Sequence, residues 1–443
     1  MYNNLSLFLA ILFPIAGFSQ SISIDSVLSH YDKSGQLMAS VAVMEAGRLT
    51  YQRSLGYRAD VSDQKVPSDS ETAYGIGSIS KVFTSTMVLQ RVEQGKLSLD
   101  DTLEQFFPGL PKGDSITIRQ LLNHSSGLHN FTADPVFQLY YTQPRSQAEF
   151  LKTFSTYQAE FSPGTQHKYS NTNYVLLSYI LEKVTGEEYS ELLDERIAQP
   201  LGLSRTQIGL TGSVEENRAF SFKLNDTTWQ QHPETHPSIA LGAGSVFSTP
   251  ADLCRFAEGV FDGKMLSSKS LETMQTFEEG YGLGLFQYIY KGDTAIGHTG
   301  GIDGFQAMLV HFPEKKLTIA FCGNGVATGM TEIVNNLVAA KLGQPVNLPA
   351  FEPISLPVSQ LEAFVGTFTA DALPFDLVFT VEDGQLMLEP TGQGKVALKA
   401  YGDRLFRYDR VALVLEFGSV EVGKPAQTVE LRQGGNFVFT RKE

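Results

Sequence analysis

The sequence predicts a mixed α/β (α+β) architecture followed by a separate all-β domain. Strand patterns occur near residues 38–56 and again near 294–322, and helix patterns occupy most of the chain between them. A sheet built from such distant segments, with helices packed on it, fits an α/β or α+β fold better than a simple βαβ repeat. Beyond residue 358 the chain contains only short alternating strand patterns.

Residues 1–20 are expected to be a cleavable signal peptide. The apolar run 5–18 is too short to span a bilayer as a mature helix, and it ends near the small residues Gly17 and Ser19. No lysine or arginine precedes this run, and a buried N-terminal helix is the alternative. We therefore expect a secreted or periplasmic protein whose mature chain is not inserted in a membrane.

The first domain, residues 21–342, is expected to begin with a β-hairpin formed by residues 38–45 and 48–56. An apolar-periodic run from 79 to 94 then predicts a helix, because it stops at Gly95 as helices commonly do. Both elements come from local patterns, so they place the first part of the chain without any assumption about tertiary contacts.

Helices are predicted through the middle of this domain. They cover residues 117–123, residues 174–184 with a stop at Gly186, and residues 189–198 with a stop before Pro200. Strands follow, and a last amphipathic helix closes the domain. These later elements are expected at residues 294–298, 305–312, 317–322 and 330–342.

Residues 343–358 carry four prolines without a periodic pattern, which is typical of a linker. The following segment, 359–443, reads as a small antiparallel β-barrel or sandwich with Gly and Asp-Gly turns. It contains no histidine or cysteine. We therefore expect any chemistry to lie in the first domain.

Composition excludes some partners. The chain has 443 residues with 34 basic and 48 acidic side chains, a net charge of −14. Nucleic acids and anionic membrane surfaces bind basic faces, so neither is expected as a partner. Cys254 and Cys322 lie in apolar stretches, and either a disulfide or two free thiols fits them. The sequence does not determine an oligomeric state.

Ser78 and Lys81 are the first candidate catalytic pair. Acyl transfer through serine needs a nucleophile, a base and donors for the developing oxyanion. Side chains three residues apart share a helix face, so the Lys81 amine can reach the Ser78 hydroxyl. The helix start also favours negative charge beside Ser78. Burial could lower the pKa of Lys81 enough for it to act as a base. The alternative is a helix cap with an incidental lysine.

Two further motifs are each weak alone. Tyr169 and Asn171 precede a helix, where the phenol could relay a proton and the amide could hold a substrate, or Tyr169 could simply pack in the core. His298 ends a predicted strand, and Gly300-Gly301 permits close backbone approach to a substrate. A loop histidine without function is the alternative for His298.

Other chemistries find less support. The Gly-x-Ser-x-Gly nucleophile elbow of α/β-hydrolases is absent. His232 and His236 have a helical zinc-ligand spacing, but Pro233 and Pro237 would break that helix. No metal and no other cofactor is expected.

Together the three motifs resemble those of the penicillin-recognising serine hydrolases: class C β-lactamases, low-molecular-weight D-alanyl-D-alanine peptidases and related esterases. Their order and their contexts match, and the resemblance covers roughly residues 25–342. Further segments also look like that family: LLNHSSGL at 121–128, PGTQHKYSNTNYVLL at 163–177, PLGL at 200–203, GAGSVFSTPADL at 242–253 and GHTGGIDGF at 297–305.

The resemblance implies an antiparallel sheet flanked by helices, an all-helical lobe, and a site between them. It leaves open whether lysine or tyrosine takes the first proton. Carried over by position, the site would comprise the nucleophile Ser78, its base Lys81, the proton shuttle Tyr169, the amide-binding Asn171, the substrate-binding His298, Thr299 and Gly300, and an oxyanion hole formed by the backbone N–H groups of Ser78 and Gly301.

One residue departs from the pattern. Many class C β-lactamases have lysine where this chain has His298, and histidine there resembles the carboxypeptidase and esterase members more. An ordinary imidazole has a pKa of about 6.5. We therefore hypothesise that carboxylate-bearing substrates are recognised less well above neutral pH.

The resemblance implies a serine hydrolase that acts through an acyl-enzyme on a small-molecule or peptide substrate. A D-amino-acid peptide or amide is the first expectation, followed by a β-lactam. An esterase of small acyl groups and a non-catalytic penicillin-binding or sensing protein are the alternatives. The C-terminal domain resembles the lipocalin-like extensions of some members, where it could restrict the cleft or act as a stabilising appendage.

Overall fold

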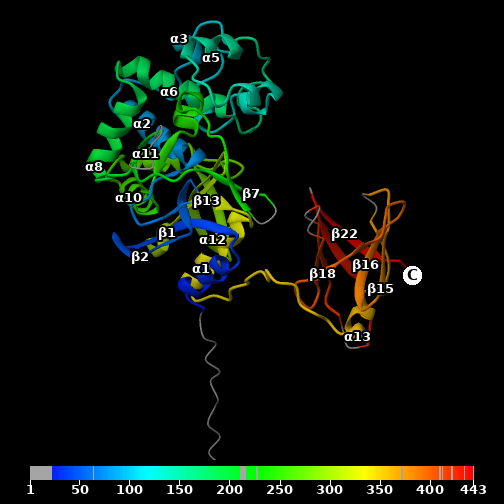
Figure 1. Ribbon diagram of the computed structural model, residues 1–443. Coiled ribbons are helices and arrows are strands. Elements are labelled where there is room, and N and C mark those ends of the chain that lie inside the picture. Colours follow the sequence, from blue (N-terminus) through cyan, green and yellow to red (C-terminus); the bar gives the residue numbers. More distant parts are fainter. Residues whose placement is uncertain are drawn as a thin grey trace, which may run out of the picture. The chain divides into compact units, whose positions relative to one another are not determined.

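The computed structural model describes residues 22–442 except 63, 210–215, 226–227, 371–372, 409–410, 412, 421–422 and 434. The predicted signal peptide lies outside these residues. Contacts between Cα atoms divide the chain into two compact units with a boundary between Val346 and Asn347 (Figure 1), and each is described by itself. Over the described part of the chain, no helix has the length and apolar character that crossing a bilayer requires.

A six-stranded antiparallel sheet forms the centre of the first unit. The amino-terminal hairpin pairs with strands from the end of the unit, so that Val41 lies opposite Phe321. The predicted antiparallel α+β fold is therefore confirmed. In spatial order the strands are β10 (Phe286–Tyr290), β11 (Asp293–Ile302), β12 (Phe305–Phe312), β13 (Leu317–Val326), β1 (Leu37–Glu45) and β2 (Arg48–Leu55).

Both faces of the sheet are covered by helices, which explains why β1 and β13 are buried along nearly their whole length rather than on one face only. Helix α10 (Pro250–Phe261) packs on β1 and β13, while α1 (Ile24–Lys33) packs on α12 (Met330–Lys341) and on β1. Figure 1 shows α1 and α12 together beside the sheet.

A helical lobe adjoins the sheet, with α3 and α5 at the far end from α1 (Figure 1). Helix α2 is buried on almost every side, so it is a core helix of the unit. Helix α6 ends at Gly186, which adopts the left-handed conformation that the sequence predicted. The lobe contains α2 (Ser80–Glu93), α3 (Leu103–Phe106), α4 (Ile118–Leu122), α5 (Gln147–Phe154), α6 (Asn171–Thr185) and α7 (Tyr189–Leu193).

The expected stop before Pro200 is wrong. After α7 the chain makes a π-helical turn (Asp194–Ala198) and continues into α8 (Gln199–Leu201), which ends at Gly202. Pro200 falls in the first turn of α8, where a missing N–H breaks no helical hydrogen bond.

Smaller elements complete the first unit. They are β3 (Tyr57–Val61), β4 (Gln64–Pro67), β5 (Tyr74–Gly75), β6 (Gln207–Ile208), β7 (Phe222–Asn225), β8 (Thr228–Gln231), β9 (Val246–Ser248), α9 (Pro237–Ala240) and α11 (Ser268–Met274).

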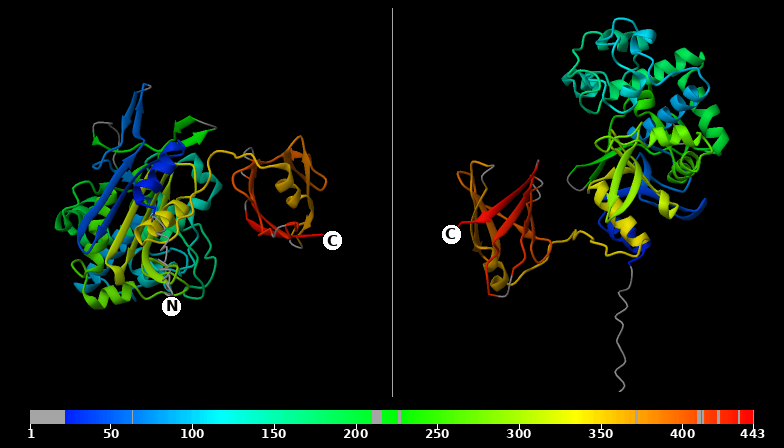
Figure 2. Two further views of the ribbon diagram at one scale, coloured as in Figure 1. Left: turned by 90° about the horizontal axis from the view of Figure 1, so that it is seen from below. Right: turned by 180° about the vertical axis from the view of Figure 1, so that it is seen from behind.

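The second unit is a nearly closed antiparallel barrel. Its sheet begins with β17 and ends with β18, two strands that follow one another in the chain, so the sheet curls back on itself (Figure 2). Phenylalanine rings pack inside, with the rings of Phe379 and Phe417 4.9 Å apart. The elements are α13 (Val358–Leu361), β14 (Gly366–Thr369), β15 (Leu377–Glu382), β16 (Gln385–Pro390), β17 (Val396–Ala397), β18 (Lys399–Ala400), β19 (Leu405–Tyr408), β20 (Leu413–Phe417), β21 (Thr428–Arg432) and β22 (Asn436–Arg441).

Replacing Phe417 by alanine is expected to lower the free energy of unfolding of the second unit by about 3–5 kcal/mol, because it leaves a cavity among four other phenylalanine rings. Differential scanning calorimetry would measure the change. Val438→Ala, at a position 62% exposed, is the control and should change it by less than about 0.5 kcal/mol. Equal effects of the two substitutions would contradict the packing.

Candidate active site

Ser78 lies in a single 3₁₀ turn, η1 (Gly77–Ile79), directly before α2. Strand β10 stops opposite Gly297, which leaves the following edge of β11 free for this turn. The approach is too close for side chains: a Cβ on Gly77 would lie 2.7 Å from the Gly301 nitrogen, and one on Gly300 would lie 1.9 Å from the Ile76 oxygen. The glycines thus bring the Ser78 turn against the sheet.

The Lys81 amine lies in a fully buried position beside Ser78. Its Nζ is 2.9 Å from Ser78 Oγ, 2.8 Å from Asn171 Oδ1 and 2.6 Å from the Ala243 carbonyl oxygen in η6 (Leu241–Ala243). Burial lowers the pKa of Lys81 well below its ordinary value. A neutral amine can donate its two hydrogens to the two carbonyl oxygens, which leaves its lone pair for the Ser78 hydroxyl hydrogen.

Tyr169 contacts the same hydroxyl from the other side. Its hydroxyl is 2.7 Å from Ser78 Oγ, and burial raises the pKa of Tyr169 above its usual value. The phenol therefore stays protonated at neutral pH and donates to Ser78. The ring of His124 packs 4.4 Å from the Tyr169 ring. The resulting chain runs from Tyr169 through Ser78 to Lys81, and it directs the serine hydrogen toward the amine.

Asn171, the first residue of α6, connects the base to the neighbouring cavity. Its Oδ1 accepts from Lys81, while its Nδ2 donates one hydrogen to Thr132 Oγ1 at 3.0 Å. The second hydrogen on Nδ2 has no partner among the hydrogen bonds of the described residues. Asn171 therefore offers one N–H to a ligand.

Gly301 lies next to Ser78 at the wall of the cavity. A Cβ on the preceding Gly300 would be 3.2 Å from the Ser78 nitrogen, so the backbone amides of η1 and β11 lie close together. Two backbone N–H groups from neighbouring elements are the usual donors of an oxyanion hole. The geometry of Ser78 and Gly301 is compatible with that role.

His298 is only 2% exposed, and its Nδ1–H donates to the Thr299 carbonyl oxygen at 2.5 Å. Burial, together with the nearby Lys81, lowers the pKa of His298 to about 3. The imidazole is therefore neutral from pH 5.5 to 8. The hypothesis that its charge changes near neutrality is wrong, because it assumed a solvated side chain.

A cavity of about 330 Å³ opens beside Ser78 and Asn171. Its walls are partly apolar, from Phe131, Phe137, Tyr141, Ile239 and Ile302. Tyr169 and His298 are not among its lining residues. The cavity therefore extends from Ser78 on the side of Asn171.

Asp303 places a carboxylate in this cavity. Its oxygens accept from the backbone N–H of Thr235 at 2.8 Å and from the Thr235 hydroxyl at 2.7 Å. Burial raises the pKa of Asp303. Lys223 also lines the cavity, but its Nζ lies 2.9 Å from His232 Nε2, and within the described residues no cation lies within ion-pairing distance of Asp303.

The structure thus brings together the residues of the three sequence motifs. It also places beside them groups that the sequence reasoning did not single out: the Ala243 carbonyl, Thr132 and Asp303. Ala243 and Asp303 lie in segments recognised only as family-like, and a backbone carbonyl has no signature in a sequence. The two cysteines are buried free thiols, which resolves that alternative.

His232 and His236 do not share a helix, because α9 begins only at Pro237. His232 lies beside Lys223 and the Pro233 carbonyl, and His236 caps α9. Within the described ranges, no three histidine, cysteine, aspartate or glutamate side chains form a group that could hold a metal ion.

Comparison with known proteins identifies relatives. The model of the beta-lactamase family matches residues 24–344. Penicillin-binding protein 4* of Bacillus subtilis is 25% identical over 416 residues, which cover 86% of this chain and 90% of that protein. A D-aminopeptidase of Brucella anthropi is 28% identical over 337 residues, which cover 73% of this chain and 62% of that protein.

Among solved structures, the D-amino acid amidase from Ochrobactrum anthropi SV3, complexed with L-phenylalanine, is similar with a TM-score of 0.64. It is 28% identical in sequence, and the match covers 72% of this chain and 97% of that one.

Replacing Lys81 by methionine is expected to slow the reaction of Ser78 with a fluorophosphonate at least about 100-fold, because no other base contacts the hydroxyl. Rates would be measured by mass spectrometry of the intact protein. Lys65→Met is the matched control, since Ser62 and Lys65 repeat the spacing on an exposed strand and loop. Similar rates for both variants would contradict the assignment of Lys81.

Proposed function

The chain belongs to the beta-lactamase family, and we propose that it is a serine hydrolase in which Ser78 forms an acyl-enzyme. The observation that carries the proposal is the hydrogen-bonded chain from Tyr169 through Ser78 to the buried amine of Lys81. A protonated phenol and a neutral amine on either side of one hydroxyl supply the acid and the base that acyl transfer needs.

In the acylation step, Ser78 Oγ attacks the substrate carbonyl carbon while Lys81 takes the hydroxyl proton. The backbone N–H groups of Ser78 and Gly301 stabilise the oxyanion. Tyr169 then protonates the leaving nitrogen, and the Lys81 ammonium stabilises the phenolate that remains, since Nζ lies 4.9 Å from the ring centre.

Deacylation returns the same protons. Water attacks the ester carbonyl and gives a proton to the Tyr169 phenolate, and Lys81 returns its proton to Ser78 Oγ as the acid product leaves. Both groups then regain their starting states.

On the leaving-group side, the properties of His298 favour substrates without a carboxylate. Its imidazole is neutral, and its N–H is directed to the Thr299 carbonyl. A lysine at this position would offer a cation, whereas a neutral buried histidine does not. This supports an amide or small amine leaving group over a β-lactam or a C-terminal D-alanine.

On the acyl side, Asp303 favours a positively charged group. Burial makes the Asp303 carboxylate costly to ionise, and Lys223, which lines the same cavity, lowers that cost without forming an ion pair, so a substrate ammonium would offset part of it. Asp303 lies in the turn after β11, where its φ is positive, and it lines the same cavity as Ser78 and Gly301. An amino group on the acyl part of the substrate would share this cavity with the carboxylate.

We therefore propose that the substrates are amides of D-amino acids and short D-amino-acid peptides with a free amino terminus. The similar D-aminopeptidase and D-amino acid amidase support the D configuration and the amide bond. The relation is distant, at 28% identity, so substrate preference rests mainly on His298 and Asp303.

D-Alanyl-D-alanine p-nitroanilide is expected to be hydrolysed with a higher kcat/KM than its N-acetyl form, its L,L isomer, or nitrocefin. Ser78→Ala should abolish the activity and the covalent adduct. Initial rates and intact mass would be measured together. Faster turnover of nitrocefin than of the peptide would contradict the substrate assignment, and full activity of S78A would contradict the mechanism.

Within the same assay, Asp303→Asn should lower kcat/KM for the free-amine peptide about tenfold and leave the N-acetyl form nearly unchanged, since only the charge partner is lost. Asp293→Asn, at the opposite end of β11, is the matched control and should affect neither.

A further inference from the structure

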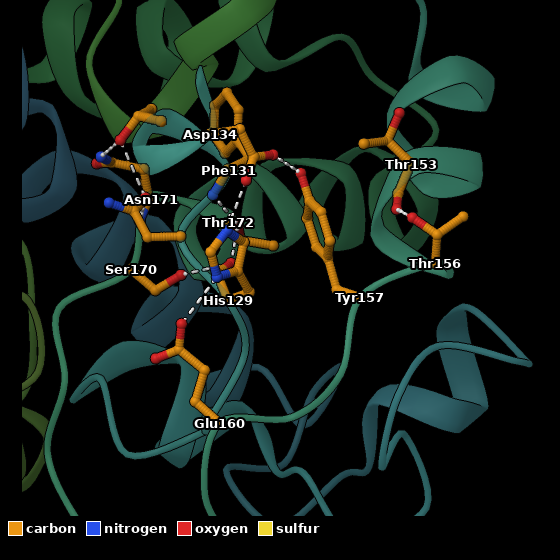
Figure 3. Close-up of polar contacts among 12 residues, drawn as sticks. His129, Phe131, Asp134, Thr153, Thr156, Tyr157, Glu160, Ser170, Asn171 and Thr172 are labelled. Carbon is orange, nitrogen blue, oxygen red and sulfur yellow. Dashed lines mark hydrogen bonds and ion pairs between the residues drawn. The ribbon is translucent and has the colours of Figure 1, made fainter. Parts of the chain in front are cut away.

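A second polar network lies next to the site and centres on His129 (Figure 3). Its Nδ1 is 2.8 Å from Glu160 Oε1, and its Nε2 is 2.7 Å from Asp134 Oδ1. Carboxylate oxygens accept hydrogen bonds, so both ring nitrogens must donate and the ring is an imidazolium. We call His129 with Asp134 and Glu160 the His129 clamp.

Further charged and titratable groups surround the His129 clamp. Tyr157 donates its hydroxyl to Asp134, and Lys168 lies 2.5 Å from Glu160. Burial, Asp134 and the nearby Tyr140 raise the pKa of Tyr157, and the charge of Arg145 lowers it. Partial burial lowers the pKa of His129, but the hydrogen bonds and charges of Glu160 and Asp134 outweigh it and raise the pKa above its ordinary value.

The backbone of His129 is tied to the start of α6. Its carbonyl oxygen accepts from the Ser170 hydroxyl at 3.2 Å and from the Thr172 hydroxyl at 2.6 Å. These residues are the immediate neighbours of Asn171, and Figure 3 shows all three beside the His129 ring. A displacement of His129 would therefore move the backbone on both sides of Asn171.

The residues after His129 hold Asn171 itself. The Asn130 side chain accepts from the Asn171 backbone N–H at 3.0 Å, and Thr132 Oγ1 accepts from Asn171 Nδ2 at 3.0 Å. With the Phe131 N–H, which donates to Thr172 Oγ1 at 3.2 Å, five hydrogen bonds connect the segment 129–132 to residues 170–172. The ion pairs of the His129 clamp fix that segment from the opposite side.

We propose that His129, held as an imidazolium between Asp134 and Glu160, is a positioning residue that orients Asn171 for binding the acyl part of the substrate. The inference rests on the proposed function. Because one Nδ2 hydrogen is fixed on Thr132, the direction of the other depends on where segment 129–132 lies. Substrates that use this N–H need the clamp, whereas substrates without an acyl amide do not.

The clamp should depend on pH in one direction. A neutral imidazole has a single N–H, so loss of a proton leaves one carboxylate without its donor. The negative charges of Asp134 and Glu160 then repel each other without a cation between them. Since the pKa of His129 is raised, the clamp is complete below that pKa and is lost as pH rises through it.

Replacing His129 by glutamine tests the proposal, because glutamine cannot donate to two carboxylates from opposite ends. For D-alanyl-D-alanine p-nitroanilide at pH 6, we expect KM to rise about tenfold in H129Q while kcat changes less than about twofold. For p-nitrophenyl acetate, which has no acyl amide, kcat/KM should stay within about twofold. For the N-acetyl peptide, which has an acyl amide but no ammonium, wild-type KM should also rise in alkali, and the KM of H129Q should not.

His311→Gln is the matched control. His311 is buried at the carboxyl end of β12, away from the segment 129–132, and its Nδ1 lies 2.9 Å from Thr318 Oγ1. The His311→Gln variant should be less stable to heat, but the ratio of kcat/KM for the peptide to kcat/KM for the ester should not change. An equal loss of kcat/KM for the peptide and the ester in H129Q would overturn the proposal, and so would an unchanged KM for the peptide.

Tyr157→Phe provides a second route if H129Q does not fold. It keeps the ring and removes only the hydroxyl that donates to Asp134, so peptide KM should rise about threefold with the ester unaffected. No rise in Y157F would overturn the proposal. A wild-type enzyme that hydrolyses neither substrate would instead refute the proposed function, which separates the two failures.

Discussion

The buried amine of Lys81 is the interaction on which the rest of the site depends. Its three contacts are a hydroxyl and two carbonyl oxygens, and among the described residues no carboxylate lies within ion-pairing distance of it. An ammonium ion is costly to bury without a counter-ion, so burial lowers the pKa of Lys81 and favours the neutral amine that the proposed mechanism needs. The chemistry of Ser78 follows from that neutrality, because only a neutral amine can accept its proton.

The fold produces this environment by bringing distant segments of the chain together around Lys81. The turn of Ser78 is held against β11 by glycines, α2 supplies Lys81, α6 supplies Asn171, and η6 supplies the Ala243 carbonyl. The Asn171 side chain accepts a hydrogen bond from Lys81 and also lines the substrate cavity. Proton transfer and acyl binding are therefore coupled through one amide group. The Asp303 carboxylate in the cavity and the neutral imidazole of His298 are the physical basis of the proposed substrate class.

The sequence predicted what depends on local pattern. The hairpin forms where expected because Ala46 and Gly47 both adopt positive φ, and the Ser78–Lys81 pair follows from helix spacing alone. Strand β10 of the central sheet was not predicted; it is an edge strand whose residues are all half-buried or exposed. The neutral state of His298 and the Asp303 carboxylate could not be predicted either, because both depend on burial by segments far away in the chain.

The pH dependence of the reaction of Ser78 with a fluorophosphonate tests the neutral amine most directly. If burial lowers the pKa of Lys81 as described, the rate should become level well below about pH 10, where an ordinary lysine titrates, and fall in acid as the amine takes up one proton. A rate that instead rises about tenfold per pH unit toward pH 10, as an ordinary lysine would give, would contradict the account.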